Sequence, residues 1–214
     1  MAIKAILFDF DGTIANTQDA FLEIVNELAD EFGYPPVDQV QLEKLKNLSS
    51  LDVIKESAIP TLKIPFILKR IKKELGKKIS ALEPYQSIIH ALFTLKERGY
   101  LIGIVTSNLK ENVLAFLEKN DLDKVFDFIH SGTTLFGKNK IINRVIKENK
   151  LKVEEVIYVG DETRDIHAAK QSKIKMISVS WGFNSPQILA QYQPDFLVHH
   201  PCELLEVVAC LDKR

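Results

Sequence analysis

The sequence predicts an α/β protein with a doubly wound parallel sheet and a helical insertion after the first strand. Beyond residue 84, short apolar runs alternate with helical patterns, and strands separated by helices pair in parallel. Between residues 18 and 80 the pattern stays helical, with no strand-like run. We therefore expect a core domain of residues 1–16 and 82–214, and an all-helical domain of residues 17–81 inserted into it.

The first strand is predicted at residues 5–8, an apolar run typical of a strand buried on both faces. Asp9 and Asp11 follow it, and two carboxylates so close together raise each other's pKa. A hard cation such as Mg²⁺ would relieve this repulsion. Gly12 allows a sharp turn that brings backbone N–H groups close to an anion. We interpret the segment as a site for a metal and a phosphate, with an ordinary Asp-Gly turn as the alternative.

The insertion is predicted to consist of helices whose apolar residues recur at helical spacing. Their apolar residues fall within positions 21–32, 40–48, 51–54 and 66–75. Asn16 or Thr17 could cap the first helix and Ser49 or Ser50 a later one. Glycines supply the expected stops, Gly33 for the first helix and Gly76 for the last.

After a linker at residues 80–84, strands and helices alternate to the end of the chain. The expected strands are residues 101–105, 128–129, 156–159, 176–179 and 196–198. The expected helices are residues 85–98, 110–120, 140–149, 166–171 and 202–211. In open parallel sheets ligands bind at the carboxyl ends of the strands, so polar residues directly after these strands are candidates for a site.

Thr106, Ser107 and Asn108 follow one of these strands. A hydroxyl and successive backbone N–H groups at a helix start can hold a phosphate, although the same residues could simply cap a helix. Lys138, after Gly137, could neutralise both Asp9 and a bound phosphate. The alternatives are that Lys138 is a solvated surface lysine, or that Lys140, on the polar side of the expected helix, takes this part.

Gly160 and Asp161 follow the strand at residues 156–159, and Asp165 comes four residues later. Two aspartates at this spacing can point toward the same place from one helical turn. The alternative is an Asp-capped helix start. Arg164 lies between them and could reach a substrate anion, although an ion pair with a neighbour is the simpler interpretation.

Composition argues against several other functions. The net charge of −1 gives no general attraction to nucleic acid, and no apolar run is long enough to span a bilayer. Asp9 and Asp11 interrupt the apolar N-terminus, so we expect no signal peptide. Cys202 and Cys210 are poorly placed to pair on one helix, which suggests free thiols in a reducing cytoplasm. His199 and His200 are interpreted as residues of a surface loop.

Four segments in this order, DFDGT, TSN, GK and GDETRD, resemble the four motifs of the haloacid dehalogenase (HAD) superfamily, nearest to its phosphoglycolate-phosphatase-like branch. The resemblance implies a Rossmann-like core with a small helical cap. It also implies that Asp9 is the nucleophile, that Asp11 is the general acid and then base, and that Mg²⁺ is the cofactor.

The same resemblance places the remaining site residues. Thr106 and Lys138 would hold the phosphoryl oxygens, with Gly12, Ser107 and Asn108 around the phosphate. Asp9, the Asp11 carbonyl and Asp161 would ligate the metal, with Asp165 outside them. Three departures from the family's pattern stand out: Asn16 replaces a common Asp, Glu162 replaces a small residue, and no proline follows Lys138. Glu162 puts the metal affinity in question.

The sequence therefore predicts a cytoplasmic Mg²⁺-dependent phosphatase acting on a small phosphomonoester, similar to phosphoglycolate or a sugar phosphate, through an aspartyl phosphate. No nucleic-acid or membrane partner is expected. A dehalogenase would lack Asp11. A phosphonatase would need a lysine of the insertion in the cleft, and a phosphomutase resembling this chain would carry a histidine in its cap. A non-catalytic phosphate-binding module is the alternative from a different functional class.

Overall fold

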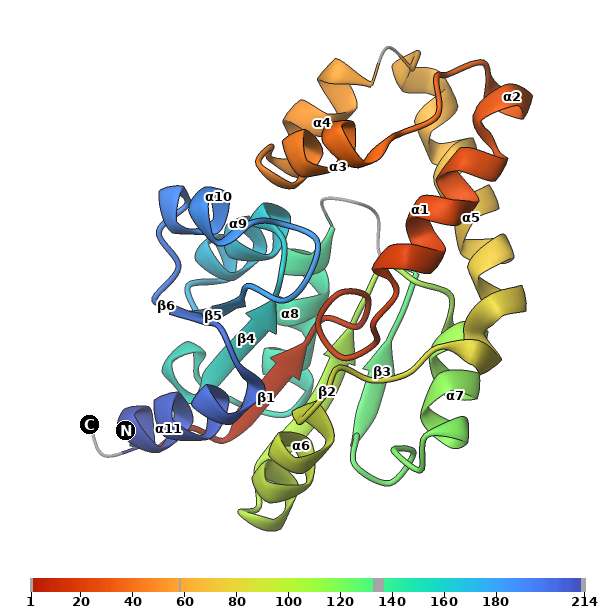
Figure 1. Ribbon diagram of the computed structural model, residues 1–214. Helices are drawn as coiled ribbons and strands as arrows, with labels where there is room; N and C mark the ends of the chain where they lie inside the picture. Colours follow the sequence, from red (N-terminus) through yellow and green to blue (C-terminus); the bar gives the residue numbers. More distant parts are fainter. Residues whose placement is uncertain (1, 58, 133–136, 213–214) are drawn as a thin grey trace.

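The computed structural model describes residues 2–57, 59–132 and 137–212, and its centre is a parallel sheet of six strands (Figure 1). The strand order is β3-β2-β1-β4-β5-β6, so β1 lies between β2 and β4. The strands are β1 Ala5–Phe8, β2 Leu101–Val105, β3 Phe128–His130, β4 Val156–Gly160, β5 Lys175–Val179 and β6 Phe196–Val198. This confirms the predicted α/β fold class.

Helices cover both faces of the sheet, as the alternation of buried side chains along β1 requires. Ile6 and Phe8 belong to a core cluster with α6, α7 and α11, whereas Leu7 belongs to a second cluster with α8, α9 and α10. These helices are α6 Ile88–Glu97, α7 Lys110–Lys119, α8 Lys138–Glu148, α9 Thr163–Ser172, α10 Pro186–Gln191 and α11 Pro201–Asp212. No helix in the described part of the chain is long and apolar enough to cross a membrane.

Between β1 and α6 the described residues form helices and no strand. They are α1 Gln18–Glu27, α2 Ala29–Phe32, α3 Gln39–Lys46, α4 Ser50–Glu56 and α5 Ile64–Lys78, with 3₁₀ turns at Thr61–Lys63 and Ile79–Ala81. Helices α1 and α5 pack on each other through a separate apolar cluster that includes Ile24 and Ile71. Figure 1 shows these helices beyond one end of the sheet. The division of the chain into two domains stays a prediction.

Several local signals have the effect that the sequence predicted. Gly33 ends α2 in the left-handed conformation, with φ of +74°. Ser49 caps α4 by accepting a hydrogen bond from the backbone N–H of Asp52. Thr17 occupies the N-cap position of α1, but its side chain makes no capping hydrogen bond.

Some predicted boundaries are wrong. Helix α6 begins at Ile88 rather than residue 85, and α8 begins at Lys138, so this lysine lies in the first turn instead of before the helix. Helix α10, Pro186–Gln191, was not predicted although Ser185 caps it and a proline stands at its first position. That short segment carries too few apolar repeats to show a helical period.

Gly76 does not end the last helix of the insertion, because α5 continues through it to Lys78. A glycine stands at this position because of packing. A Cβ at residue 76 would lie 2.5 Å from Oδ1 of Asn112 on α7. The amide of Asn112 in turn donates to the carbonyl of Lys72, 2.8 Å away. Gly76 therefore allows α5 and α7 to approach closely.

This packing gives a stability prediction. In an open helix interior, Gly→Ala stabilises by about 0.5–1 kcal/mol. We expect Gly76→Ala instead to destabilise by about 1–2 kcal/mol, because the added methyl overpacks against Asn112. Urea unfolding measures the change. In an Asn112→Ala background the clash is absent, so the same substitution should stabilise; destabilisation of similar size in both backgrounds would contradict the packing explanation.

Candidate active site

The residues predicted from the ends of three strands meet at the carboxyl edge of the sheet. Asp9 follows β1, Thr106 follows β2 and Asp161 follows β4, and all three side chains are buried. The backbone N–H of Asp9 donates to the carbonyl of Val159, so the β1–β4 ladder continues to this residue. The hydrogen bonds of the central strands thus fix the position of the backbone at Asp9, independently of side-chain contacts in the site.

The turn after β1 holds Asp11 beside Asp9. The carbonyl of Phe10 accepts hydrogen bonds from the N–H groups of Ile14 and Ala15, while the Phe10 ring packs edge-on against Phe116. Gly12 has a φ of +76°, and a Cβ there would lie 2.3 Å from a carboxylate oxygen of Asp161. Only glycine satisfies both constraints.

An acidic cluster occupies the floor of the site. One carboxylate oxygen each from Asp9, Asp161 and Asp165 lies within 4.8 Å of the others, and all three residues are buried. Asp161 accepts 2.7 Å hydrogen bonds from the Thr13 hydroxyl and the Phe183 N–H. Burial, together with Glu162 and the other two aspartates, raises the pKa of Asp161 well above its ordinary value. Acceptor-only oxygens with excess negative charge fit a hard divalent cation such as Mg²⁺.

Lys138 is the buried cation of the site. Its ammonium lies 2.5 Å from Oδ2 of Asp9 and 2.5 Å from Oδ1 of Asp165. Burial alone would lower the pKa of Lys138, but the two carboxylates outweigh it and the pKa is raised, so the lysine stays charged. Lys140, the competing candidate, is exposed. Asp165 also accepts a hydrogen bond from the N–H of Glu162, so neither of its oxygens is free.

Asp11 contacts Asn108, in the segment that follows β2. The side-chain amide of Asn108 donates to both of its carboxylate oxygens at 3.0 Å. Burial, reinforced by the charge of Asp9, raises the pKa of Asp11 to about 7. A carboxyl group with such a pKa can give or take a proton near neutrality.

Helix α7 begins at Lys110, as predicted, so Thr106, Ser107 and Asn108 lie in the segment between β2 and this helix. Thr106 is buried, and its hydroxyl accepts a 3.0 Å hydrogen bond from the N–H of Asn108. Ser107 lines a cavity beside Asp11. Asn112, which the sequence analysis missed, donates to Oδ1 of Asn108 and so orients it. Its only sequence signal is a polar side chain among the apolar positions of the helix.

Glu162 and Arg164 connect the site to the helical insertion. Glu162 accepts a hydrogen bond from the Ser50 hydroxyl at 3.1 Å and forms an ion pair with Arg164. The N–H of Ser50 also donates to the hydroxyl of Thr163. Glu162 is therefore engaged with the insertion and is not a member of the acidic cluster.

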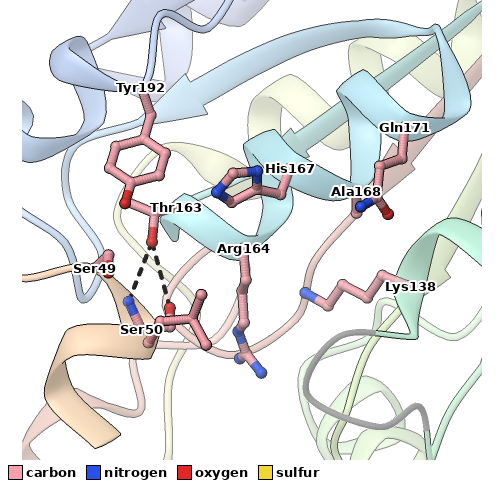
Figure 2. Close-up of a pocket in the computed structure, with 10 residues that line it drawn as sticks. Ser49, Ser50, Lys138, Thr163, Arg164, His167, Ala168, Gln171 and Tyr192 are labelled. Atoms are coloured by element: carbon pink, nitrogen blue, oxygen red, sulfur yellow. Dashed lines mark hydrogen bonds between the residues drawn. The ribbon is translucent and has the colours of Figure 1, made fainter. Parts of the chain in front are cut away.

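Two cavities adjoin these residues. One, of about 370 Å³, extends from Asp11 between the helices of the insertion; the other, of about 340 Å³, lies between α4 and α9. Arg164 and Ser50 line both. Figure 2 shows Lys138 and Arg164 at the second cavity, with Thr163 linked to Ser50. The site is thus open to a ligand from the side of the insertion.

Comparison with known proteins gives consistent matches over most of the chain. The model of the haloacid dehalogenase-like hydrolases matches residues 6–179. A phosphoglycolate phosphatase of Synechococcus elongatus is 32% identical and covers 99% of this chain and 100% of its own. A pyrophosphatase PpaX of Bacillus cereus is 24% identical, with full coverage of both chains. A haloacid dehalogenase-like hydrolase structure from Streptococcus pneumoniae has a TM-score of 0.79 at 23% identity, covering 96% and 98%.

The acidic cluster gives a prediction for stability against pH. Asp165, through burial, has a pKa of about 6, and the pKa values of Asp11 and Asp161 are also raised from the ordinary 3.8. Without metal, the folded state then binds more protons than the unfolded state from pH about 4 to 7. Stability should therefore fall as the pH rises through this window, and thermal unfolding at several pH values measures the fall.

Asp161→Asn is the matched variant for this prediction. Asparagine keeps the shape and removes one charge, so the metal-free variant should be more stable at pH 7 and its pH slope shallower. Mg²⁺ at 100 times its Kd should stabilise the original chain by about 2.7 kcal/mol and the variant by much less. An equal Mg²⁺ effect on both proteins would contradict the assignment of this cluster as the metal site.

Proposed function

The chain belongs to the haloacid dehalogenase-like hydrolase family, and on that premise we propose that it hydrolyses a small phosphomonoester with Mg²⁺ and an aspartyl-phosphate intermediate. The enzyme is a phosphatase, as are the relatives named for that activity. One observation carries the proposal: Asp9 lies against the buried Lys138, and Asp11, with a pKa of about 7, is two residues away. A carboxylate nucleophile, a fixed cation and a proton donor are the groups that two successive displacements at phosphorus need.

In the first displacement an oxygen of Asp9 attacks phosphorus as the bond from phosphorus to the ester oxygen breaks. Asp11 gives its proton to the leaving alkoxide. In the second, the carboxylate of Asp11 takes a proton from water, the water oxygen attacks phosphorus, and the bond to Asp9 breaks. Asn108, fixed by Asn112, keeps the Asp11 carboxyl in place through both steps.

The carboxylates of this pocket repel the negative charge of a phosphate. Two groups of residues would offset this repulsion, one by holding the phosphoryl oxygens and one by holding a metal ion. Lys138 and the hydroxyl of Thr106 would hold the phosphoryl oxygens, with Gly12, Ser107 and Asn108 around them. Asp9, the carbonyl of Asp11 and Asp161 would hold Mg²⁺, which supplies positive charge to the transferring group. Asp165, whose oxygens are already engaged by Lys138 and Glu162, would orient the lysine from outside the metal shell.

We also propose that residues 17–81 form a cap domain over the core domain of residues 1–16 and 82–214. The separate apolar cluster of α1 and α5 supports this, as does the cavity between the insertion and Asp11. The substrate would be a small phosphorylated metabolite of the cytoplasm, similar to phosphoglycolate or a sugar phosphate. The relative named phosphoglycolate phosphatase favours the former.

The nucleophile gives the test of this proposal. Asp9→Asn is nearly isosteric, so we expect turnover to be lost, by about 10³-fold or more, with the fold retained. In the unsubstituted enzyme, rapid quenching with labelled substrate should trap phosphate on Asp9, and chelation should stop turnover until Mg²⁺ is returned. Near-normal kcat in the variant would exclude the covalent mechanism, and full activity in excess chelator would exclude the metal.

The fate of the phosphoryl group separates a hydrolase from a phosphomutase. A mutase must keep water from the aspartyl phosphate until a sugar hydroxyl arrives. In related mutases a cap histidine helps to keep the general acid/base from activating water until the sugar is bound. None of the five histidines of this chain lies within residues 17–81. With a hexose 1-phosphate and a trace of the bisphosphate, free phosphate should form faster than the 6-phosphate isomer. The opposite order of rates would replace the phosphatase assignment by a mutase.

A further inference from the structure

Tyr158 lies in the middle of β4 and has no role in the reaction proposed above. It is the largest fully buried side chain in the described part of the chain, and it shares a core cluster with residues of α8 and α9. An apolar residue would suit a strand buried on both faces, whereas a buried phenol must find a hydrogen-bond acceptor. This side chain makes one contact through its hydroxyl and one through its ring, and both lead to the candidate site.

The hydroxyl of Tyr158 donates a hydrogen bond of 2.9 Å to the carbonyl of Val105, the last residue of β2. Since β1 lies between β2 and β4, the side chain reaches across one strand to make this contact. The carbonyl of Val105 and the N–H of Thr106 belong to one planar peptide unit. That N–H donates to the carbonyl of His130 on β3, 3.0 Å away. Tyr158 therefore supplies one of two hydrogen bonds that hold the peptide leading into Thr106.

The ring of Tyr158 faces the ammonium of Lys138. Nζ lies 5.7 Å from the centre of the ring, inside the limit of about 6 Å at which the negative face of an aromatic ring attracts a cation. Lys138 is almost completely buried, so water does not weaken this attraction. The carboxylates of Asp9 and Asp165 contact the same ammonium. The ring thus adds a third contact to a cation that the two ion pairs alone would hold less firmly.

Tyr158 keeps its proton near neutral pH. Burial, and then the charges of Asp165 and Asp9, raise the pKa of Tyr158 well above its ordinary value. Deprotonation would remove the donor to Val105 and add a further negative charge beside two carboxylates. The hydroxyl is therefore available as a hydrogen-bond donor throughout the neutral range.

We propose that Tyr158 is a positioning residue for the phosphoryl transfer, because its hydroxyl fixes the peptide before Thr106 and its ring holds the ammonium of Lys138. The inference rests on the proposed function, in which Thr106 and Lys138 hold the phosphoryl oxygens. Tyr158 acts through these two residues and not on the substrate. Charge shifts among the phosphoryl oxygens as the bond to phosphorus breaks, so misplaced partners weaken the transition state more than the bound substrate. Loss of Tyr158 should therefore lower kcat and leave KM nearly unchanged.

Two substitutions separate the hydroxyl from the ring. Tyr158→Phe removes the hydroxyl and keeps the ring, whereas Tyr158→Leu removes both. With para-nitrophenyl phosphate and Mg²⁺, we expect kcat to fall about tenfold in Tyr158→Phe and about 100-fold in Tyr158→Leu. Each variant is assayed at a temperature at which its unfolding curve shows it to be folded. A normal kcat in Tyr158→Phe would overturn the role of the hydroxyl, and a normal kcat in Tyr158→Leu would overturn the whole proposal.

Fluorinated phenylalanines at position 158 test the ring with almost no change in packing. Successive ring fluorines weaken the negative face of the ring in steps, while the side chain stays nearly the same size. With Tyr158→Phe as the reference, the logarithm of kcat should fall with each added fluorine. A side chain that only fills the core would give a flat series, so a flat series would overturn the role of the ring.

Met176→Ala is the matched control. Met176 is the residue of β5 that pairs with Tyr158, and it is buried in the same core cluster. Its loss should lower the stability, as Tyr158→Leu does, since both substitutions empty space in a packed core. The kcat should stay unchanged, because the side chain of Met176 contributes apolar packing alone. A loss of kcat in Met176→Ala as large as that in Tyr158→Leu would overturn the positioning role.

Two measurements without turnover separate this inference from the proposed function. Calorimetry with orthovanadate and Mg²⁺ should show binding weakened by about tenfold or more in Tyr158→Leu and unchanged in Met176→Ala. The NMR signal of the Lys138 ammonium should be shifted by the ring and should lose this shift in Tyr158→Leu. Both results support the positioning role even if the enzyme hydrolyses no phosphomonoester. Normal turnover with equal vanadate affinity and an unshifted ammonium signal would keep the phosphatase and overturn the positioning role.

Discussion

The arrangement of this site depends on one ion-pair network, in which the ammonium of Lys138 joins Asp9 and Asp165. Buried carboxylates so close together repel one another, and a buried charge without a partner is strongly destabilising. The cation comes from the first turn of α8, where Lys138 reaches Asp9 directly after β1 and Asp165 on α9. This contact joins the Asp9 side chain to α9.

The fold and the positions of the chemical groups could be predicted because both follow from local patterns. Apolar runs mark buried strands, and parallel strands bring the residues after them to one edge, so Asp9, Thr106 and Asp161 could be grouped without coordinates. What could not be predicted depends on contacts between distant segments. The glycine at position 76 lies inside α5 and is explained by Asn112, which lies on another helix far along the chain.

The contacts of Glu162 and Arg164 show the same limit. The sequence marked Glu162 as a departure from the family's pattern, in which a small residue is common there, and this put the metal affinity in question. In the structure Glu162 forms an ion pair with Arg164 and accepts a hydrogen bond from the hydroxyl of Ser50 in the insertion. The amide of Asn184 likewise donates to the carbonyl of Leu48. The contacts Ser50–Glu162 and Leu48–Asn184 join residues more than 100 positions apart, and a single sequence carries no signal for such contacts.

The two ends of the insertion leave the core side by side. Ala15 and Pro84 form an antiparallel bridge, and the N–H of Asn16 donates to the carbonyl of Glu83. Because the two ends of the insertion lie together, folding of the core pays only the entropic cost of closing this segment into a loop. That cost grows only slowly with the length of the segment. The junction at Ala15 and Pro84 is therefore a point where one insertion can be replaced by another. Insertions of different length and composition can be joined there while the sheet and its catalytic edge stay unchanged.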